Sequence, residues 1–160
     1  MGEQMTDTAT TEIGATGSST TNNAVLQDFI DRYNAAWNAH DVDAIMAMHA
    51  ANMVFENHTA GETATGEAVR AHVAAIFKGW PDLAFEERRL YLRDDLIVQE
   101  WTASATHVKE LKRGDLTAPA SGKKISWRGV DVIPLENGLI ARKDVYSDSV
   151  GILRQVGLLD

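Results

Sequence analysis

The first half of the chain carries apolar side chains at helical spacings. Between residues 24 and 38 they recur every three or four positions, which predicts a helix with Asn22 or Asn23 as its cap. The apolar side of this helix is formed by Leu26, Phe29, Ile30, Tyr33 and Trp37. A second, shorter helix is predicted over 40–50, "HDVDAIMAMHA", with Asp41 as its cap, followed by a brief strand, "MVFENH". A third helix follows the loop "TAGETATG" and ends at "GWPD".

Strand patterns dominate the second half. Four segments are rich in β-branched and aromatic residues and partly alternate in polarity: "LAFEERRLYLR", "LIVQEWTASATH", "KISWRGVDVIPL" and "LIARKDVYSD". They are joined by "DD", by a loop containing "KRGDLTAPASG" and by "ENG", and such short connections imply antiparallel pairing. Helices followed by a meander of strands predict an α+β fold, with the helices packed on one face of a curved sheet.

The predicted strands mix large, charged and small residues. These are Trp101, Trp127, Asp131 and Lys143, with Ala103, Ala105 and Gly129 among them. Small and polar side chains on an inner face leave a pocket rather than a filled core. The alternative is that the tryptophans themselves fill the interior.

Composition narrows the classes of function. A formal charge of −8 argues against a nucleic-acid or anionic-membrane surface, and no apolar run is long enough for a membrane span. The absence of cysteine excludes disulfides and thiolate chemistry and fits a cytoplasmic protein. Residues 1–22 are rich in Thr, Ser and Gly, so we expect a disordered tail there and one domain over 23–160.

Four stretches, in their order and spacing, resemble the SnoaL-like branch of the nuclear transport factor 2 superfamily. They are "AAWNAHDVDAIMAMHAANMVFEN", "GEAVRAHVAAIFKGWPDL", "WTASATHVKEL" and "ENGLIARKDVYSDSVGILRQVGLL". Together they cover nearly everything from Asn23 to Asp160. The resemblance implies a cone-shaped fold, in which a bent sheet and three helices enclose a deep apolar pocket. It also implies a homodimer and a small apolar molecule as the binding partner.

The family includes polyketide cyclases, which close a ring by an intramolecular aldol reaction, and its relatives include epoxide hydrolases and ketosteroid isomerases. Their common requirement is proton transfer at a sequestered organic substrate without a cofactor. An apolar pocket raises the proton affinity of a carboxylate and so makes it a competent base near neutral pH.

This chain departs from the family at the positions that carry that chemistry. The acid–base carboxylate on the last strand of the cyclases corresponds to Val145, counted outward from the Asn-Gly turn. The Asp-Arg-Asp set of the epoxide hydrolases falls on Trp101, Ala103 and again Val145, so that mechanism is disfavoured.

Polar residues remain at three positions of the family. Of the hydrolase residues that hold water on the short strand, a tyrosine corresponds to Phe55, and only the asparagine, Asn57, is kept. Asp131 aligns with a histidine that assists the cyclase carboxylate, and His107 ends a strand where similar sequences also carry histidine.

The register of the last hairpin decides which residues face the pocket. If "ENG" is a three-residue loop, Asp131 faces Lys143 and both share a face with Val145. If Asn-Gly is a two-residue turn, the pairing shifts by one residue, and Asp131 instead shares a face of the sheet with Asp144, Tyr146 and Asp148. The family alignment favours the first arrangement.

Two functions remain open. The first is a cofactor-independent enzyme that uses acid–base chemistry on an apolar carbonyl-containing or polyketide-like molecule, and the second is a non-catalytic binding or scaffolding protein. The catalytic candidates are Asp131, His107 and Asn57, and the candidate pocket residues are Tyr33, Phe55, Trp101, Trp127, Lys143 and Val145. Lys143 would neutralise Asp131 or polarise a carbonyl. No pair of ligands at metal spacing is present, so no metal is expected.

Overall fold

The computed structural model describes residues 16–160, with side chains from residue 21 onward. The helices are α1 (Thr16–Asn38), α2 (Val42–Ala47), α3 (Ala68–Gly79) and α4 (Ser149–Gln155). The strands are β1 (His49–Asn57), β2 (Glu62–Thr65), β3 (Ala84–Arg93), β4 (Leu96–Thr106), β5 (Leu111–Arg113), β6 (Leu116–Ala118), β7 (Lys124–Glu136) and β8 (Leu139–Ser147).

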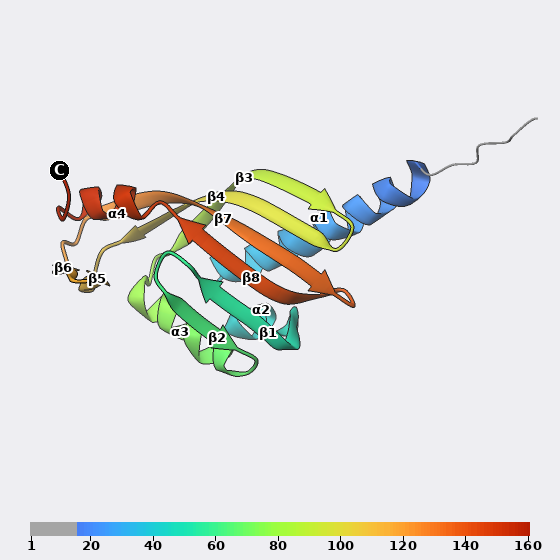
Figure 1. The fold of residues 1–160 in the computed structure, drawn as a ribbon, viewed down its shortest axis with the longest axis horizontal. Helices are drawn as coiled ribbons and strands as arrows, with labels where there is room; N and C mark the ends of the chain where they lie inside the picture. Colours follow the sequence, from blue (N-terminus) through green and yellow to red (C-terminus); the bar gives the residue numbers. More distant parts are fainter. Residues whose placement is uncertain (1–15) are drawn as a thin grey trace, which may run out of the picture.

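Six strands form one curved sheet in the order β2-β1-β8-β7-β4-β3 (Figure 1). All neighbouring pairs are antiparallel except β1 and β8, which run parallel and bring the first strand beside the last. The short strands β5 and β6 form a separate hairpin, which packs near α4 through Leu111, Ala118 and Ile152. The mostly antiparallel sheet confirms the predicted α+β class.

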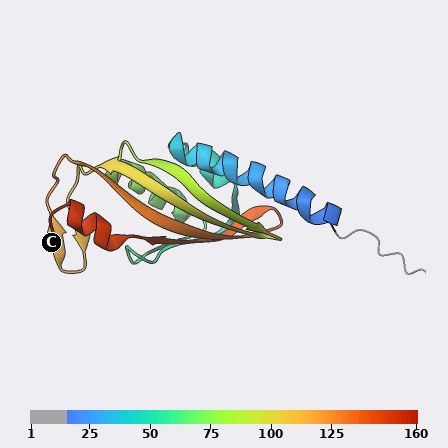
Figure 2. The ribbon, with the colours of Figure 1, turned by 90° about the horizontal axis from the view of Figure 1, so that it is seen from above.

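The long helix α1 lies along one face of the sheet (Figure 2). It packs against β3, while α3 packs against β1 and β2. The apolar side of α1 is the one predicted, and its five residues are all buried. Within the described residues, none of the helices has the length and apolarity that a transmembrane span requires.

The first helix begins earlier than the sequence suggested. It starts at Thr16, so the expected start near Asn23 falls inside it. Asn22 does not cap the helix, because its side-chain amide donates to the carbonyl of Asp94 in the β3–β4 turn at 2.9 Å. The remainder of the expected disordered tail, residues 1–15, lies outside the described residues.

Two segments expected as helix or loop join sheets instead. The second helix ends at Ala47 rather than residue 50, because His49 already pairs with Ile140 of β8. The predicted loop after β1 contains β2, and the predicted loop between β4 and β7 contains the β5–β6 hairpin. Both additions are short strands in polar sequence, where apolar alternation gives little signal.

The last hairpin has the two-residue turn of the second predicted arrangement. Asp131 and Val145 nevertheless share a face of the sheet, as in the first arrangement. Asn137 and Gly138 form a two-residue turn, with φ of 52° and 76°, between the paired residues Glu136 and Leu139. Between the pairs Leu135–Ile140 and Val132–Asp144, β8 then has one residue more than β7. The extra residue shifts all later pairs by one position in β8, so Asp131 lies opposite Val145 rather than Asp144.

Pro134 lies in β7 at this bulge, where a residue without an N–H group is tolerated. We name the irregularity the β8 bulge, and it comprises residues 141–143 of β8 opposite 133–134 of β7.

Candidate functional site

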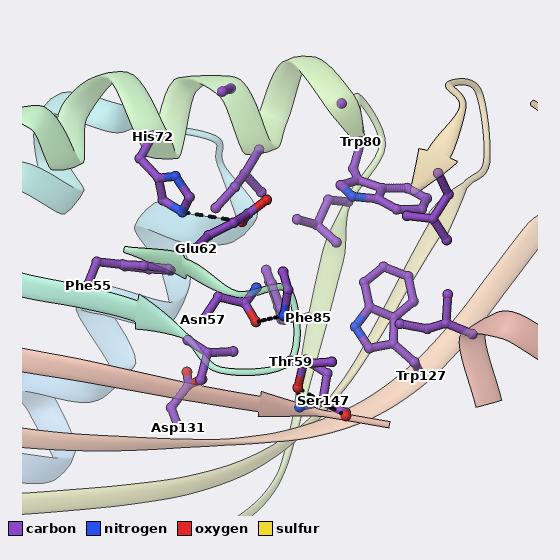
Figure 3. A pocket seen from close by; sticks show the side chains of 18 of the residues that line it. Phe55, Asn57, Thr59, Glu62, His72, Trp80, Phe85, Trp127, Asp131 and Ser147 are labelled. Atoms are coloured by element: carbon purple, nitrogen blue, oxygen red, sulfur yellow. Dashed lines mark hydrogen bonds and ion pairs between the residues drawn. The ribbon is translucent and has the colours of Figure 1, made fainter. Parts of the chain in front are cut away.

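A cavity of about 460 Å³ lies between α3 and the inner face of the sheet (Figure 3). Its aromatic lining consists of Trp37, Phe55, Trp80, Phe85, Trp101 and Trp127. Seven of the predicted site residues line it, namely Phe55, Asn57, Trp101, Trp127, Asp131, Lys143 and Val145. The tryptophans therefore border an open space rather than filling it, and the pocket hypothesis describes this interior better than the alternative.

Asp131 is the buried carboxylate of this cavity. It is 2% exposed, and its Oδ2 atom lies 3.2 Å from Nζ of Lys143, which is 5% exposed. Gln99 donates from Nε2 to the same Oδ2 at 3.0 Å. The other oxygen, Oδ1, is buried and has no hydrogen-bond partner among the described residues. One oxygen is therefore held by two donors, while the second is buried at the cavity wall without a partner among the described residues.

Aromatic rings surround the ammonium group of Lys143. Its Nζ lies 4.3 Å from the ring centroid of Trp37, 5.2 Å from that of Tyr33 and 5.7 Å from that of Phe55. The negative faces of such rings attract a cation, and here they replace the water that burial removes. The rings and Asp131 together hold the ammonium group in one place at the cavity wall.

The ion pair also borders a second, smaller cavity of about 300 Å³. This cavity is lined by residues of α1 and β3, including Asn34 and Glu87, together with Gln99. Asp131 and Lys143 therefore lie between an aromatic cavity and a more polar one.

Tyr33 does not reach the larger cavity. Its hydroxyl lies 2.9 Å from Nε2 of His49, and the side chain is fully buried behind Lys143. Burial raises the pKa of Tyr33 well above its usual range, so the phenol stays protonated. Burial, and then the positive charge of Lys143, lowers the pKa of His49 to about 4.

The depressed pKa of His49 makes stability depend on pH. The imidazole is neutral in the fold at neutral pH, whereas in the unfolded chain it binds a proton near the ordinary histidine pKa of 6.5. This stabilisation is complete above the unfolded pKa and is lost as the pH falls toward about 4. We expect the free energy of unfolding, measured with urea, to be about 2 kcal/mol lower at pH ~5 than at pH ~7.5. His49→Gln should remove most of that difference. An unchanged pH dependence in His49→Gln would contradict this assignment.

His107 lies away from the cavity lining. It is 1% exposed, and its Nδ1 atom is 3.0 Å from Oγ of Ser121. Its backbone pairs with Lys123 and Gly122, and its ring is 6.1 Å from that of Trp80. This histidine joins the end of β4 to the segment before β7, so the geometry favours the strand-end role over a proton shuttle at the mouth.

The cavity contains a second titratable pair that the sequence interpretation did not select. His72 of α3 points toward Glu62 of β2 (Figure 3), with 3.7 Å between Nε2 and Oε2. Asn57 lies opposite Glu62 in the sheet, and its Oδ1 accepts from the backbone N–H of Ala60 at 3.0 Å. His72 follows the buried Val69 by three positions in α3. This helical spacing is the one feature of the sequence that could have placed His72 on the inner side of the helix.

Trp101 forms part of the wall because Gly129 makes room for it. The two residues are directly opposite in the β4–β7 pair. A Cβ atom at position 129 would overlap the indole of Trp101. The glycine is therefore required by close packing rather than by its backbone angles.

The other face of β8 carries a separate charged cluster. Asp144 accepts from Nε of Arg142 at 2.8 Å and lies 2.8 Å from Nε2 of His58. The hydrogen bonds with Arg142 hold the pKa of Asp144 below its usual range. Glu56 also pairs with Arg142, and His58 stacks on Tyr146 with centroids 4.4 Å apart. As predicted for the first hairpin arrangement, Asp144 and Tyr146 face away from Asp131.

The side chains of Glu56, His58 and Asp144 lie close enough together to hold a metal ion. Arg142 already pairs with both carboxylates, however, and supplies the positive charge at this position. A cation would have to displace the guanidinium group, so we assign this cluster to the structure of the outer face.

Comparison with known proteins gives consistent matches in sequence and fold. The family model for SnoaL-like polyketide cyclase matches residues 27–156. TsrD from Streptomyces laurentii is 26% identical, with a TM-score of 0.70 over 85% of this chain and 97% of that chain. AclR from Streptomyces galilaeus is 20% identical, with a TM-score of 0.72 over 86% of this chain and 87% of that chain.

A SnoaL-like polyketide cyclase from Agrobacterium tumefaciens is 23% identical, with a TM-score of 0.69 over 82% of this chain and 98% of that chain. Comparison with curated proteins found no match. The structural neighbours share the predicted cone-shaped fold.

Proposed function

Because this chain belongs to the SnoaL-like polyketide cyclase family, we propose that it is a small enzyme that uses general acid–base chemistry without a cofactor. The substrate is an apolar, carbonyl-containing or polyketide-like molecule. The free oxygen of Asp131 carries this proposal, because it is a buried base at the wall of an aromatic cavity. Asp131 here takes the role that the family's carboxylate at the position of Val145 would have.

The proposed reaction starts with removal of a proton from a carbon next to a carbonyl group. Oδ1 of Asp131 accepts that proton while Lys143 and Gln99 hold Oδ2. The resulting enolate carbon attacks a second carbonyl of the same molecule and a carbon–carbon bond closes the ring. The new alkoxide then takes the proton back from Asp131, which returns that carboxylate to its ionised form. Buried donors without a partner among residues 21–160, such as Nε1 of Trp101, are suited to carbonyl or enolate oxygens.

The general base can be tested with a neutral probe, 5-nitrobenzisoxazole, which opens to a cyanophenolate when a base removes its ring proton. The wild-type protein should accelerate this elimination, and Asp131→Asn should reduce the rate by about 100-fold or more. Absorbance of the phenolate product measures the rate. Asp144→Asn is the matched control, because its carboxylate lies on the next residue pair but faces the other side of the sheet.

Asp131→Asn leaves Lys143 without its counter-charge, so folding must be checked by circular dichroism. The double variant Asp131→Asn/Lys143→Met has no unpaired buried charge and should be equally slow in the elimination. Retention of the wild-type rate in the folded double variant would contradict the proposal.

A second candidate function is a non-catalytic protein that binds a small molecule. Val145 at the family's carboxylate position and the neutralisation of Asp131 by Lys143 favour it. Such a protein would bind a flat aromatic molecule such as anthraquinone-2-carboxylate. It would not accelerate the elimination of 5-nitrobenzisoxazole above the rate of Asp131→Asn. The homodimer and the cytoplasmic location expected from the sequence stay predictions.

A further inference from the structure

Arg113 lies at the tip of the β5–β6 hairpin and lines the aromatic cavity. It pairs with Leu116 across a two-residue turn in which Gly114 has a φ of 57°. Leu111 at the other end of β5 packs against Ile152 of α4. The hairpin is thereby fixed to the end of the sheet, and Arg113 has a defined place on the cavity wall.

Arg113 is a cation without a counter-ion in the described part of the chain. Its Nη1 donates to the backbone carbonyl of Lys112 at 2.9 Å, while its Nε is buried and unpartnered. The other two cations that line the cavity are paired, Lys143 with Asp131 and Lys112 with Glu110. Of the cavity's cations, Arg113 is thus the one that residues 21–160 leave unpaired.

An unpaired guanidinium with a buried donor favours an anionic ligand. A buried N–H that lacks an acceptor costs free energy, and a guanidinium binds a carboxylate with two parallel hydrogen bonds. We propose that Arg113 forms a carboxylate subsite, so that the substrate of the proposed reaction is an apolar carbonyl compound bearing a carboxylate group. The inference rests on the proposed function only in placing the substrate in this cavity.

Because the protein as a whole is negatively charged, a preference for carboxylates would have to come from Arg113 itself. With a formal charge of −8, the surface as a whole repels anions. A carboxylate would therefore gain affinity only through a local cation. The carboxylate occupies the end near the hairpin, and the reacting carbonyl groups extend toward Asp131 and Lys143.

Two aromatic probes of the same shape test the subsite. Anthraquinone-2-carboxylate carries the charge, and anthraquinone-2-carboxamide is its neutral counterpart. We expect isothermal titration calorimetry to show that the wild-type protein binds the carboxylate at least about tenfold more tightly than the amide. Arg113→Gln should remove this preference by weakening carboxylate binding alone. Lys109→Gln removes the same charge from an exposed residue outside the cavity lining, and it should keep the preference.

Several results would overturn the carboxylate subsite. They are equal wild-type affinity for both probes, an unchanged preference in Arg113→Gln, the same loss in Lys109→Gln, or no binding of the carboxylate probe at millimolar concentration. The general base is tested separately, because 5-nitrobenzisoxazole has no anionic group. A carboxylate preference that depends on Arg113, together with no elimination activity, would contradict the base and leave the subsite standing.

Discussion

Replacing Lys143 with methionine is expected to lower the free energy of unfolding by about 3–5 kcal/mol, because it leaves the buried carboxylate of Asp131 without its counter-charge. The two side chains are 6% and 3% exposed, so water cannot take the place of the ammonium group. Methionine has a similar length and keeps the contacts with the surrounding rings. Urea unfolding at neutral pH, followed by tryptophan fluorescence, measures the difference.

The charge explanation predicts a rescue. Adding Asp131→Asn to Lys143→Met removes the unpaired charge and should restore about 2 kcal/mol or more. Lys112→Met is the matched control, because it removes an ion pair of similar length, 3.1 Å to Glu110, in which Lys112 is 71% exposed. Its cost should stay below about 1 kcal/mol. If the double variant is no more stable than Lys143→Met, the loss comes from packing and not from the carboxylate.

Gly129→Val is expected to cost about 3 kcal/mol and to reduce the cavity at the same time. Its Cβ atom would overlap the indole of Trp101, and the two further methyl groups crowd the same space. The indole can yield only by moving, and the cavity is the open space that it borders. Thermal unfolding measures the stability, and calorimetry with anthraquinone-2-carboxylate measures the remaining space.

Removal of the indole should reverse much of this effect. Gly129→Val/Trp101→Ala should be more stable than the sum of the two single changes, because the overlap exists only when both side chains are large. Gly79→Val is the control glycine, since no atom lies within 4 Å of a Cβ built there. It should cost less than about 1 kcal/mol. Additive effects of Gly129→Val and Trp101→Ala would show that the indole is not the obstacle.

The sequence was most informative where side chains repeat with a clear period. The apolar side of α1 and the alternation along β4 follow directly from burial on one side of each element. The pairing of Asp131 with Lys143 also followed, because an ionised carboxylate in a central strand requires a partner. These features depend on short-range pattern and on the cost of burying charge.

The remaining features depend on contacts between distant segments. The position of His107 depends on Ser121, fourteen residues further along the chain, and on the neighbouring loop backbone. His72 and Glu62 meet only because α3 packs over β2, and neither residue belongs to a distinctive motif. Arg113 lies in a segment of Gly, Asp and Thr whose composition predicts a loop, whereas the structure has a short hairpin there. Such placements require the tertiary structure, since no local period encodes them.

The β8 bulge determines which face of the final strand is turned toward the cavity. With the bulge, the phase of β8 directs Lys143 and Val145 toward the cavity and Asp144 and Tyr146 outward. A regular ladder from the same two-residue turn, without the bulge, would place Asp131 opposite Asp144 and exchange the two sets. The same strand would then present an acid and a phenol to the substrate instead of a cation and an apolar side chain. The one extra residue that β8 accommodates at the bulge therefore determines the chemistry of this pocket wall, although it changes no side chain beyond it.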